Sequence, residues 1–374
     1  MKRVNYQLED LLDRKQILLD DQSISAQLKG KVVLITGAAG SIGSEIVRQV
    51  IDFSPECIIM LDQAETPLYL LELEMGVMAA GASFYSEIAD VSDKNAVNEV
   101  FKKYRPDVVY HAAAYKHVQM MEKNPSQAIM VNVLGTKNVA DCANLNNVDT
   151  FVLISTDKAV NPGSIMGASK LIAEKYVQAL HDKLIQQEKT GATKYLITRF
   201  GNVLGSNGSV VPVFAKQIQD GGPVTITHPD ITRFFMTIKE ACQLVLEAGA
   251  MGKGGEIYIF DMGKQVKIID LALKMIRMAG LEPEKNIEIK YVGLRPGEKL
   301  YEELVTDTSK MLPTHNNNIM ISREEPQDYD VINGSINKMI TLAQQFNVFE
   351  AVAEMKKIVP EFISLNSEFK GLEL

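Results

Sequence analysis

The sequence predicts an α/β fold in which a doubly wound parallel sheet is accompanied by a smaller C-terminal lobe. Short, largely continuous apolar runs recur along the chain, and amphipathic stretches separate them. A strand of a parallel sheet that helices cover on both faces requires such a run. Strands that alternate with helices through right-handed crossovers form a Rossmann-like sheet. We expect the strands at residues 32–35, 57–61, 108–110, 150–154, 195–198 and 257–260.

Composition divides the chain into three segments. Residues 1–29 are polar with scattered leucines and form a lead-in to the first strand. Residues 30–200 are expected to form the sheet domain that binds a dinucleotide. From residue 201 the chain is richer in glycine and proline, so residues 201–374 are expected to form the smaller, substrate-binding lobe, partly interleaved with the sheet. Apolar residues at steps of three and four predict helices after Ile165 and at 336–346.

Charge and composition argue against several functional classes. The net charge is −8 and no block of lysine and arginine stands out, so we expect no nucleic-acid partner. No apolar run reaches the roughly 18 residues of a membrane-spanning helix, so no span is expected in this chain. Cys57, Cys142 and Cys242 lie far apart and are expected to be buried, reduced thiols, which predicts a reducing compartment and no metal site.

A glycine-rich turn follows the first predicted strand. Its glycines are spaced to permit a tight turn, close approach of the backbone to a pyrophosphate, and close packing of a helix on the strand. The helix beginning near Ser41 would direct its free N–H groups and the positive end of its dipole at the phosphates. The segment therefore predicts a dinucleotide site containing Gly37, Ala39, Gly40, Ser41, Ile42 and Gly43.

Residues that follow the later strands predict which dinucleotide binds. Asp62 and Gln63 end the second strand, where a carboxylate can accept hydrogen bonds from both ribose hydroxyl groups. A 2′-phosphate would be repelled by Asp62, and no arginine is adjacent, so NAD is favoured over NADP. Asp90 is expected to contact the adenine, although capping of a helix is an alternative. The remaining cofactor contacts are expected at Val91, Ala112, Ala113 and Ala114.

Seven motifs together carry a family resemblance. They are Gly-Ala-Ala-Gly-Ser-Ile-Gly at 37–43, His-Ala-Ala-Ala-Tyr-Lys-His-Val at 111–118, Ser-Thr-Asp-Lys-Ala at 155–159, Met166-x-x-x-Lys170, Arg-Phe-Gly-Asn-Val-Leu-Gly-Ser at 199–206, Thr-Arg-Phe-Phe-Met at 232–236 and Arg-Pro-Gly-Glu-Lys at 295–299. With these motifs the chain resembles the extended short-chain dehydrogenases/reductases. Within them it is similar to the nucleotide-sugar 4,6-dehydratases of polysaccharide and glycan biosynthesis, over residues 28–299.

The resemblance implies a dehydration of UDP-N-acetylglucosamine in which the cofactor is regenerated. NAD⁺ would accept a hydride from C4 of the sugar, and the resulting ketone would acidify the C5 proton. A base would remove that proton while an acid protonates the departing C6 hydroxyl group. The hydride would then return to C6 and give a UDP-4-keto-6-deoxy-N-acetylhexosamine.

The resemblance also assigns roles to five residues. Asp157 would be the acid for the C6 hydroxyl group and Lys158 the base for C5, while Thr156 would hydrogen-bond the C4 oxygen. Lys170 would hold the nicotinamide ribose. Met166 stands where these enzymes usually carry tyrosine, and it cannot exchange a proton. Asp157, Lys158 or a water on Thr156 could take the C4 proton instead; Met166 would pack against the nicotinamide or the sugar, or simply fill the core.

Six further residues are expected to contact the substrate. Lys116 and His117 follow the small residues after the fourth strand, with a surface charge and a structural histidine as the alternatives. Asn202 matches a position near the diphosphate. For Arg233 and Arg295 the alternative is an ion pair inside the lobe. The expected substrate residues are Lys116, His117, Asn202, Arg233, Arg295 and Glu298.

Two alternative functions remain, and the resemblance has further implications for stereochemistry, assembly and location. A nucleotide-sugar 4-epimerase would share the fold and NAD but would lose no water, and a non-catalytic NAD-binding scaffold would need none of the retained polar residues. Because Met166 replaces tyrosine, the resemblance favours retention at C5 and a D-xylo product. It also implies a homo-oligomer in the cytoplasm. Residues 1–29 look like the stretch after the membrane region of longer relatives, which suggests the cytoplasmic domain of an inner-membrane protein.

Overall fold

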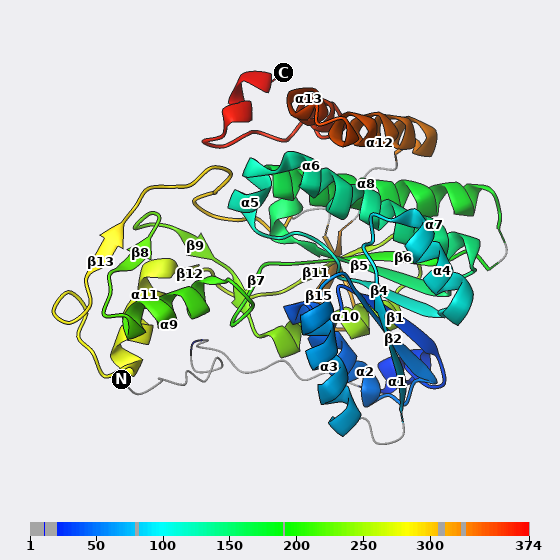
Figure 1. Ribbon diagram of the computed structural model, residues 1–374, viewed down its shortest axis with the longest axis horizontal. Coiled ribbons are helices and arrows are strands. Elements are labelled where there is room, and N and C mark those ends of the chain that lie inside the picture. Colours follow the sequence, from blue (N-terminus) through cyan, green and yellow to red (C-terminus); the bar gives the residue numbers. More distant parts are fainter. Residues whose placement is uncertain are drawn as a thin grey trace.

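A nine-stranded sheet forms the centre of the computed structural model (Figure 1), which describes residues 11, 21–78, 82–189, 191–305, 311–322 and 327–373. The strand order is β14-β15-β11-β6-β5-β4-β1-β2-β3. The strands from β11 to β3 are mutually parallel, and β15 and β14 add an antiparallel edge. This order confirms the doubly wound, Rossmann-like sheet predicted from the sequence.

The predicted strands are present, with none extended by more than two residues at either end. The strands of the large sheet are β1 (Val32–Thr36), β2 (Cys57–Asp62), β3 (Ser83–Ile88), β4 (Val108–His111), β5 (Thr150–Thr156), β6 (Lys194–Phe200), β11 (Ile257–Phe260), β14 (Met311–Pro313) and β15 (Ile319–Ser322). No run predicted β3, β14 or β15. Residues of β3 alternate in exposure, as expected at the edge of a sheet where one face lacks full cover.

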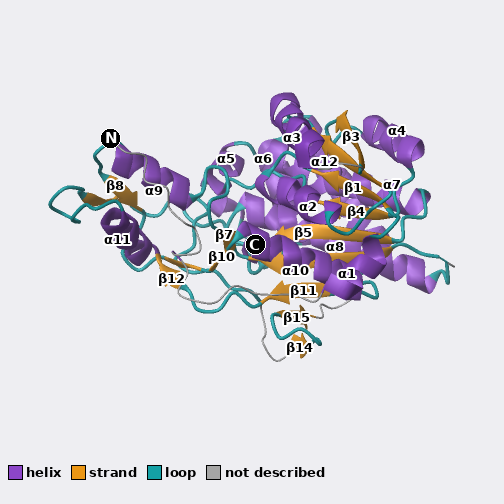
Figure 2. Cartoon of the chain, turned by 90° about the horizontal axis from the view of Figure 1, so that it is seen from below, coloured by secondary structure: helices purple, strands orange, loops and turns teal. Residues whose placement is uncertain are grey.

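Helices cover both faces of the sheet (Figure 2). One hydrophobic core lies beneath α4 (Lys94–Tyr104), α7 (Thr136–Leu145) and α8 (Ile165–Gln186), with α12 (Tyr329–Gln344) and α13 (Val348–Ile358) packed outside. The other core lies beneath α1 (Asp21–Leu28), α2 (Ser41–Ile51), α3 (Glu65–Met78) and α10 (Ile238–Met251). Both cores therefore contain residues from before and after position 200.

A third core belongs to the smaller lobe. It packs α9 (Val210–Gln219) and α11 (Ile268–Met278) around the paired strands β8 (Val224–Ile226) and β13 (Ile289–Tyr291). Two short pairs connect this lobe to the sheet, β7 (Asn202–Val203) with β10 (Phe235–Met236) and β9 (Thr232–Arg233) with β12 (Val266–Lys267). The polypeptide leaves β6 at residue 200 and enters the lobe directly, at the carboxyl edge of the sheet.

A buried ion pair fixes α8 on the sheet. The Arg199 guanidinium on β6 donates to both carboxylate oxygens of Glu174 on α8, with Nη2 to Oε2 at 2.5 Å. Both side chains are almost fully buried. Loss of either partner would leave a buried, unpaired charge, which is costly. The pair therefore strongly constrains the position of the helix that carries Met166 and Lys170.

The structure bears on two expectations from the composition, the state of the cysteines and the lack of a membrane-spanning helix. Cys57, Cys142 and Cys242 are buried and form no disulfide bond. Over the part of the chain that the structure describes, every helix is too short or too polar to cross a bilayer.

Candidate active site

The glycine-rich turn joins β1 to α2 at the carboxyl edge of the sheet. Gly37 has a positive φ of 66°, a conformation that favours glycine. A Cβ atom on Gly43 would lie 2.1 Å from the Gly37 carbonyl oxygen, so any larger residue at position 43 would force the turn open. Gly40 precedes the first turn of α2 and has no side chain to occupy the N–H groups there. The turn thus leaves the helix N-terminus accessible to an anion.

Most of the residues predicted to bind the cofactor line one cleft beside this turn, with a volume of about 130 Å³. The predicted residues among its walls are Gly37, Gly40, Asp62, Gln63, Asp90, Val91, Ala112, Ala113 and Ala114. Leu61, Ala89, Tyr115 and Val131 also line it, and the sequence analysis missed them. Tyr115 directly follows the three alanines and accepts a hydrogen bond from Gln63, so its place in that motif was the available signal.

The remaining predicted cofactor residues stand behind or beside the cleft. The amide of Ala39 donates to Asp62 Oδ2 at 2.9 Å, and Ala64 donates to Oδ1, which fixes the carboxylate at the end of β2. Ile42 and Gly43 lie in the first turn of α2. Ser41 accepts a hydrogen bond from the amide of Asn207, which joins the glycine turn to the smaller lobe. Asp90 accepts from the amide of Ser92, and Asp93 caps α4, so Asp90 is not that helix's cap.

Asp157 and Lys158 form an ion pair where β5 ends. The Lys158 Nζ lies 2.9 Å from Asp157 Oδ1 and 2.9 Å from Asn202 Oδ1, so it bridges the sheet and the smaller lobe. The Thr156 hydroxyl group donates to the same Asp157 oxygen at 2.8 Å. The Asp157 side chain is fully buried, whereas that of Lys158 is about one-fifth exposed. The structure therefore brings Thr156, Asp157 and Lys158 together and adds a contact with Asn202, which the sequence had placed near the diphosphate and not beside Lys158.

Lys170 is buried on α8 behind this pair. Its Nζ donates to the carbonyl oxygen of Ile154 at 2.8 Å. Burial lowers the pKa of Lys170 to about 8, although the charge of Glu174 acts in the opposite direction. Burial lowers the pKa of His111 to about 3, and the positive charge of Lys170 contributes to this shift, so His111 is neutral. Neutral His111 is held between the hydroxyl groups of Thr36 and Thr136.

Met166 lies one helical turn before Lys170 and belongs to the hydrophobic core beneath α8, with 3% of its surface exposed. The structure thus places it in the core-filling position that the sequence left open.

Lys116 and His117 lie on the exposed loop that follows the three alanines. Desolvation by the surrounding protein lowers the pKa of both side chains, and the positive charge of Lys116 lowers the pKa of His117 further. The imidazole ring of His117 occupies the space where a Cβ atom on Gly208 would stand. This contact links the loop to the segment after Asn202.

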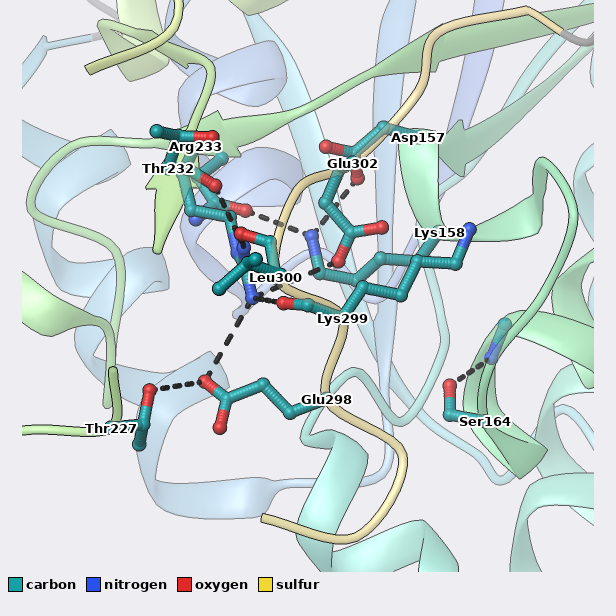
Figure 3. A network of polar contacts seen from close by, with 12 residues as sticks. Asp157, Lys158, Ser164, Thr227, Thr232, Arg233, Glu298, Lys299, Leu300 and Glu302 are labelled. Carbon is teal, nitrogen blue, oxygen red and sulfur yellow. Dashed lines mark hydrogen bonds and ion pairs between the residues drawn. The ribbon is translucent and has the colours of Figure 1, made fainter. Parts of the chain in front are cut away.

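The two predicted arginines differ in environment. Arg233 is buried and donates to the carbonyl oxygens of Thr232, Lys299 and Leu300. Its Nη2 lies 3.8 Å from Glu298, which is the intralobe ion pair considered as the alternative for this residue. Arg295 is exposed, and its guanidinium donates to Gln119. Glu298 accepts a hydrogen bond from Thr227 (Figure 3). It also accepts one from the amide of Arg295, so it organises the loop around that arginine.

One buried carboxyl group of this region was missed by the sequence analysis. Glu302 lies beyond the Arg-Pro-Gly-Glu-Lys motif and its Oε1 is 4.0 Å from Arg233 Nη2. A larger cleft of about 940 Å³ opens elsewhere, between the distal part of α8 and the strands β11 and β15. None of the predicted site residues lines that cleft, so we assign the candidate active site to the carboxyl edge of the sheet.

Comparison with known proteins gives consistent matches. The family described as "Polysaccharide biosynthesis protein" matches residues 33–324. The chain is 52% identical over 298 residues to "Probable polysaccharide biosynthesis protein EpsC" of Bacillus subtilis, a match that covers 79% of this chain and 48% of that protein. The chain therefore spans about half the length of that relative.

Two relatives are named as nucleotide-sugar enzymes. The chain is 33% identical over 341 residues to "UDP-N-acetylglucosamine 4,6-dehydratase (inverting)" of Campylobacter jejuni, covering 91% of this chain and 93% of that protein. It is 34% identical over 282 residues to "UDP-glucose 4-epimerase" of Rickettsia bellii, covering 74% and 78%. Among solved structures, Pen from Bacillus thuringiensis superposes with a TM-score of 0.72 at 31% identity, covering 83% of this chain and 98% of that one.

Proposed function

The chain belongs to the polysaccharide biosynthesis protein family, whose relatives include nucleotide-sugar dehydratases and epimerases, and we propose that it is an NAD-dependent UDP-N-acetylglucosamine 4,6-dehydratase. The observation that carries this proposal is the Asp157–Lys158 pair. A fully buried carboxyl group and an amino group 2.9 Å apart stand at the carboxyl end of β5, where doubly wound sheets bind their ligands. Dehydration needs such an acid and base in addition to the dinucleotide.

The residues that line the cleft beside the glycine turn suit part of a dinucleotide such as NAD. Three small side chains, Ala112, Ala113 and Ala114, leave room for the cofactor against the backbone, and α2 directs its first N–H groups toward the pyrophosphate position. The fixed carboxylate of Asp62 would accept from the ribose hydroxyl groups. When bound, NAD⁺ would accept a hydride from C4 of the sugar and return it to C6.

The chain's own residues would move the protons. The Thr156 hydroxyl group donates to Asp157, so a proton leaving the C4 hydroxyl group could pass through Thr156 to Asp157. Lys158, entering this step as the neutral amine, would remove the C5 proton, and Asp157 would give its proton to the C6 hydroxyl group as water departs. Asp157 thus gains one proton from the C4 hydroxyl group and loses one to the C6 hydroxyl group. Lys158 can return its proton to C5.

We further propose that C5 retains its configuration, which gives the D-xylo product. Support comes from Met166, which occupies the position of the tyrosine associated with the inverting branch. The Campylobacter jejuni relative is named as inverting, so the stereochemistry is to be measured and not transferred from it.

Epimerisation is the second candidate, because a relative that is 34% identical is named as a 4-epimerase. In an epimerase the hydride returns to C4 and no hydroxyl group leaves. The buried Asp157 carboxyl group would then have no proton to deliver. The position of this acid therefore favours dehydration.

The test is incubation of the purified chain with UDP-N-acetylglucosamine and catalytic NAD⁺ in D₂O, followed by mass spectrometry and proton NMR. We expect loss of one water, a new 6-methyl signal and deuterium at C5, with the C5 coupling constants reporting retention. Asp157→Asn should abolish water loss. Formation of UDP-N-acetylgalactosamine without a change of mass would establish the epimerase, and NAD binding without turnover of any UDP sugar would favour a scaffold.

A further inference from the structure

Glu302 is a buried carboxyl group that the proposed proton path does not use. Its side chain is about 5% exposed, and its backbone carbonyl oxygen is fixed by Gln265 at 3.0 Å. Figure 3 shows the carboxyl groups of Glu302 and Asp157 turned toward the region of the Lys158 amino group. The residue comes from the loop between β13 and β14, so it is supplied by a different part of the chain from the Asp157–Lys158 pair.

Asp157 and Glu302 each have an unsatisfied oxygen. Among the residues that the structure describes, Asp157 Oδ2 and Glu302 Oε2 are buried and have no hydrogen-bond partner. An ionised carboxylate with a buried, unpartnered oxygen is costly, typically by about 1–3 kcal/mol or more. Two carboxyl groups that share a buried site lower this cost by keeping one proton between them.

The charges that face Glu302 come from several elements. Burial raises the pKa of Glu302, and the negative charge of Asp157 raises it further, while three cations oppose both effects. Two of these cations are also paired with other carboxylates, Arg233 with Glu298 at 3.8 Å and Lys299 with Glu303 at 3.8 Å. The ionisable groups of this neighbourhood are Asp157, Lys158, Arg233, Glu298, Lys299 and Glu303.

We propose that Glu302 is a positioning residue for the proton chemistry, and that Glu302 and Asp157 together hold one proton in the resting enzyme. Glu302 touches neither substrate nor cofactor in this proposal and acts through Asp157 and Lys158. The inference rests on the proposed dehydration and deepens it, because it names a second carboxyl group that acts on the proposed acid, Asp157.

The proton count stays balanced over the cycle. The carboxyl pair begins with one proton and gains a second when the C4 hydroxyl group is oxidised to the ketone. Breaking of the C6–O bond consumes one of these protons in the departing water and returns the pair to one. The C5 proton passes to the neutral amine of Lys158 and back to carbon, so no external proton donor is required.

The test compares Glu302→Gln with Glu303→Gln, an identical change one position further along at a half-buried site outside the catalytic group. For Glu302→Gln we expect kcat to fall at least tenfold, with KM for the UDP sugar within twofold of the wild type. Reduced cofactor should accumulate in a single turnover, because C4 is oxidised but water leaves slowly. The alkaline limb of the kcat profile should move to lower pH, since an acid without a neighbouring negative charge loses its proton more readily. Glu302→Asp should restore part of kcat.

An infrared measurement keeps this inference separate from the proposed function. The carbonyl band of a protonated carboxyl group should be present at neutral pH in the wild type and in Glu303→Gln, and absent in Glu302→Gln. If the band follows this pattern but no UDP sugar is dehydrated, the proposed function fails and the shared proton stands. If the wild type dehydrates its substrate and Glu302→Gln matches Glu303→Gln in kcat, pH profile and infrared spectrum, the inference is wrong. Should Glu302→Gln fail to fold, Glu302→Asp with an unchanged pH profile would also contradict it.

Discussion

Lys170 is a residue whose charge opposes folding. Its folded pKa of about 8 lies below the ordinary 10.5 because the side chain is buried, so the unfolded chain binds more protons between these values. Stability should therefore rise as the pH increases from about 8 to 10.5. Lys170→Met should be more stable than the wild type at pH 7, by about 3 kcal/mol at most, and this difference should vanish near pH 10.5.

Urea denaturation of both proteins at the two pH values measures this effect. The control is Lys175→Met on the same helix, where the side chain is 15% exposed and faces Glu361 at 3.8 Å, so it reports the effect of removing a lysine from α8 outside the candidate site. A Lys170→Met protein that is less stable than the wild type at pH 7 would mean that the Ile154 contact outweighs the cost of burial. Catalytic activity should be lost in Lys170→Met in either case.

Asp62 is the residue that should select the cofactor. A 2′-phosphate beside its carboxylate would meet like-charge repulsion, which at a partly buried site is large enough to weaken binding at least about tenfold. The wild type should therefore bind NAD⁺ more tightly than NADP⁺ by that factor, and Asp62→Ser should lose the preference. Fluorescence titration with each cofactor measures it. Asp93→Ser is the matched control, because Asp93 also accepts two backbone N–H bonds but lies outside the cleft; equal preference in the wild type would contradict the prediction.

At the residue scale, the sequence indicates which chemistry is present but not which of two similar residues performs it. Asp157, Lys158 and Asn202 could be predicted because motifs place them at strand ends, and the structure brings them within hydrogen-bonding distance. Glu302 and Glu303 are adjacent glutamates and cannot be distinguished by type. Only the path of the loop decides that Glu302 is buried and faces Arg233 while Glu303 pairs with Lys299.

At the scale of elements, the glycine turn between β1 and α2 is expected to tolerate no side chain at position 43. A Cβ atom there would lie 2.1 Å from the carbonyl oxygen of Gly37, which is backbone and cannot swing away. Gly43→Ala should therefore reduce NAD affinity at least about tenfold and lower stability by about 1–3 kcal/mol through overpacking. Calorimetric titration and thermal melting measure the two effects.

The control for this turn is Gly76→Ala within α3. No atom lies within 4 Å of the position where its Cβ atom would stand, and the residue is exposed. Alanine in the interior of a helix should raise stability by about 0.5–1 kcal/mol and leave NAD affinity unchanged. If Gly43→Ala behaved like Gly76→Ala, the turn would not be the constraint that its geometry indicates.

The sequence predicted the strands whose side chains are buried on both faces of the sheet, but not the strands that have one face exposed to solvent. The run at 57–61 is apolar throughout and forms β2, whereas β3 mixes polar with apolar residues and has no fully buried residue, because it closes the sheet at an edge. The antiparallel strands β14 and β15 are short. Their assignment to the sheet depends on the pairing of β15 with β11, a contact across some 60 residues that local pattern cannot indicate, and on the pairing of β14 with β15.

At the scale of the whole molecule, the large sheet is built from distant parts of the chain. β11 pairs with β6 in parallel, and α10 packs on the same face as α2. The segment expected to form a sheet domain, residues 30–200, therefore shares both of its cores with residues from beyond position 200. The smaller lobe has its own core, which contains α9, α11 and the pair β8–β13.

This division predicts that the two ligands protect different segments from hydrogen exchange. NAD⁺ alone should slow exchange at 37–43, 61–63, 89–91 and 112–115, because those segments line or support the cleft beside the glycine turn. UDP alone should act mainly on 202–233 and 290–300, which hold Asn202, Arg233 and Arg295. Lys158 bonds to both Asp157 and Asn202, so the segment at 156–158 should be fully protected only when both ligands are present. Exchange measured by mass spectrometry would contradict this assignment if UDP alone protected the glycine turn as strongly as NAD⁺ does.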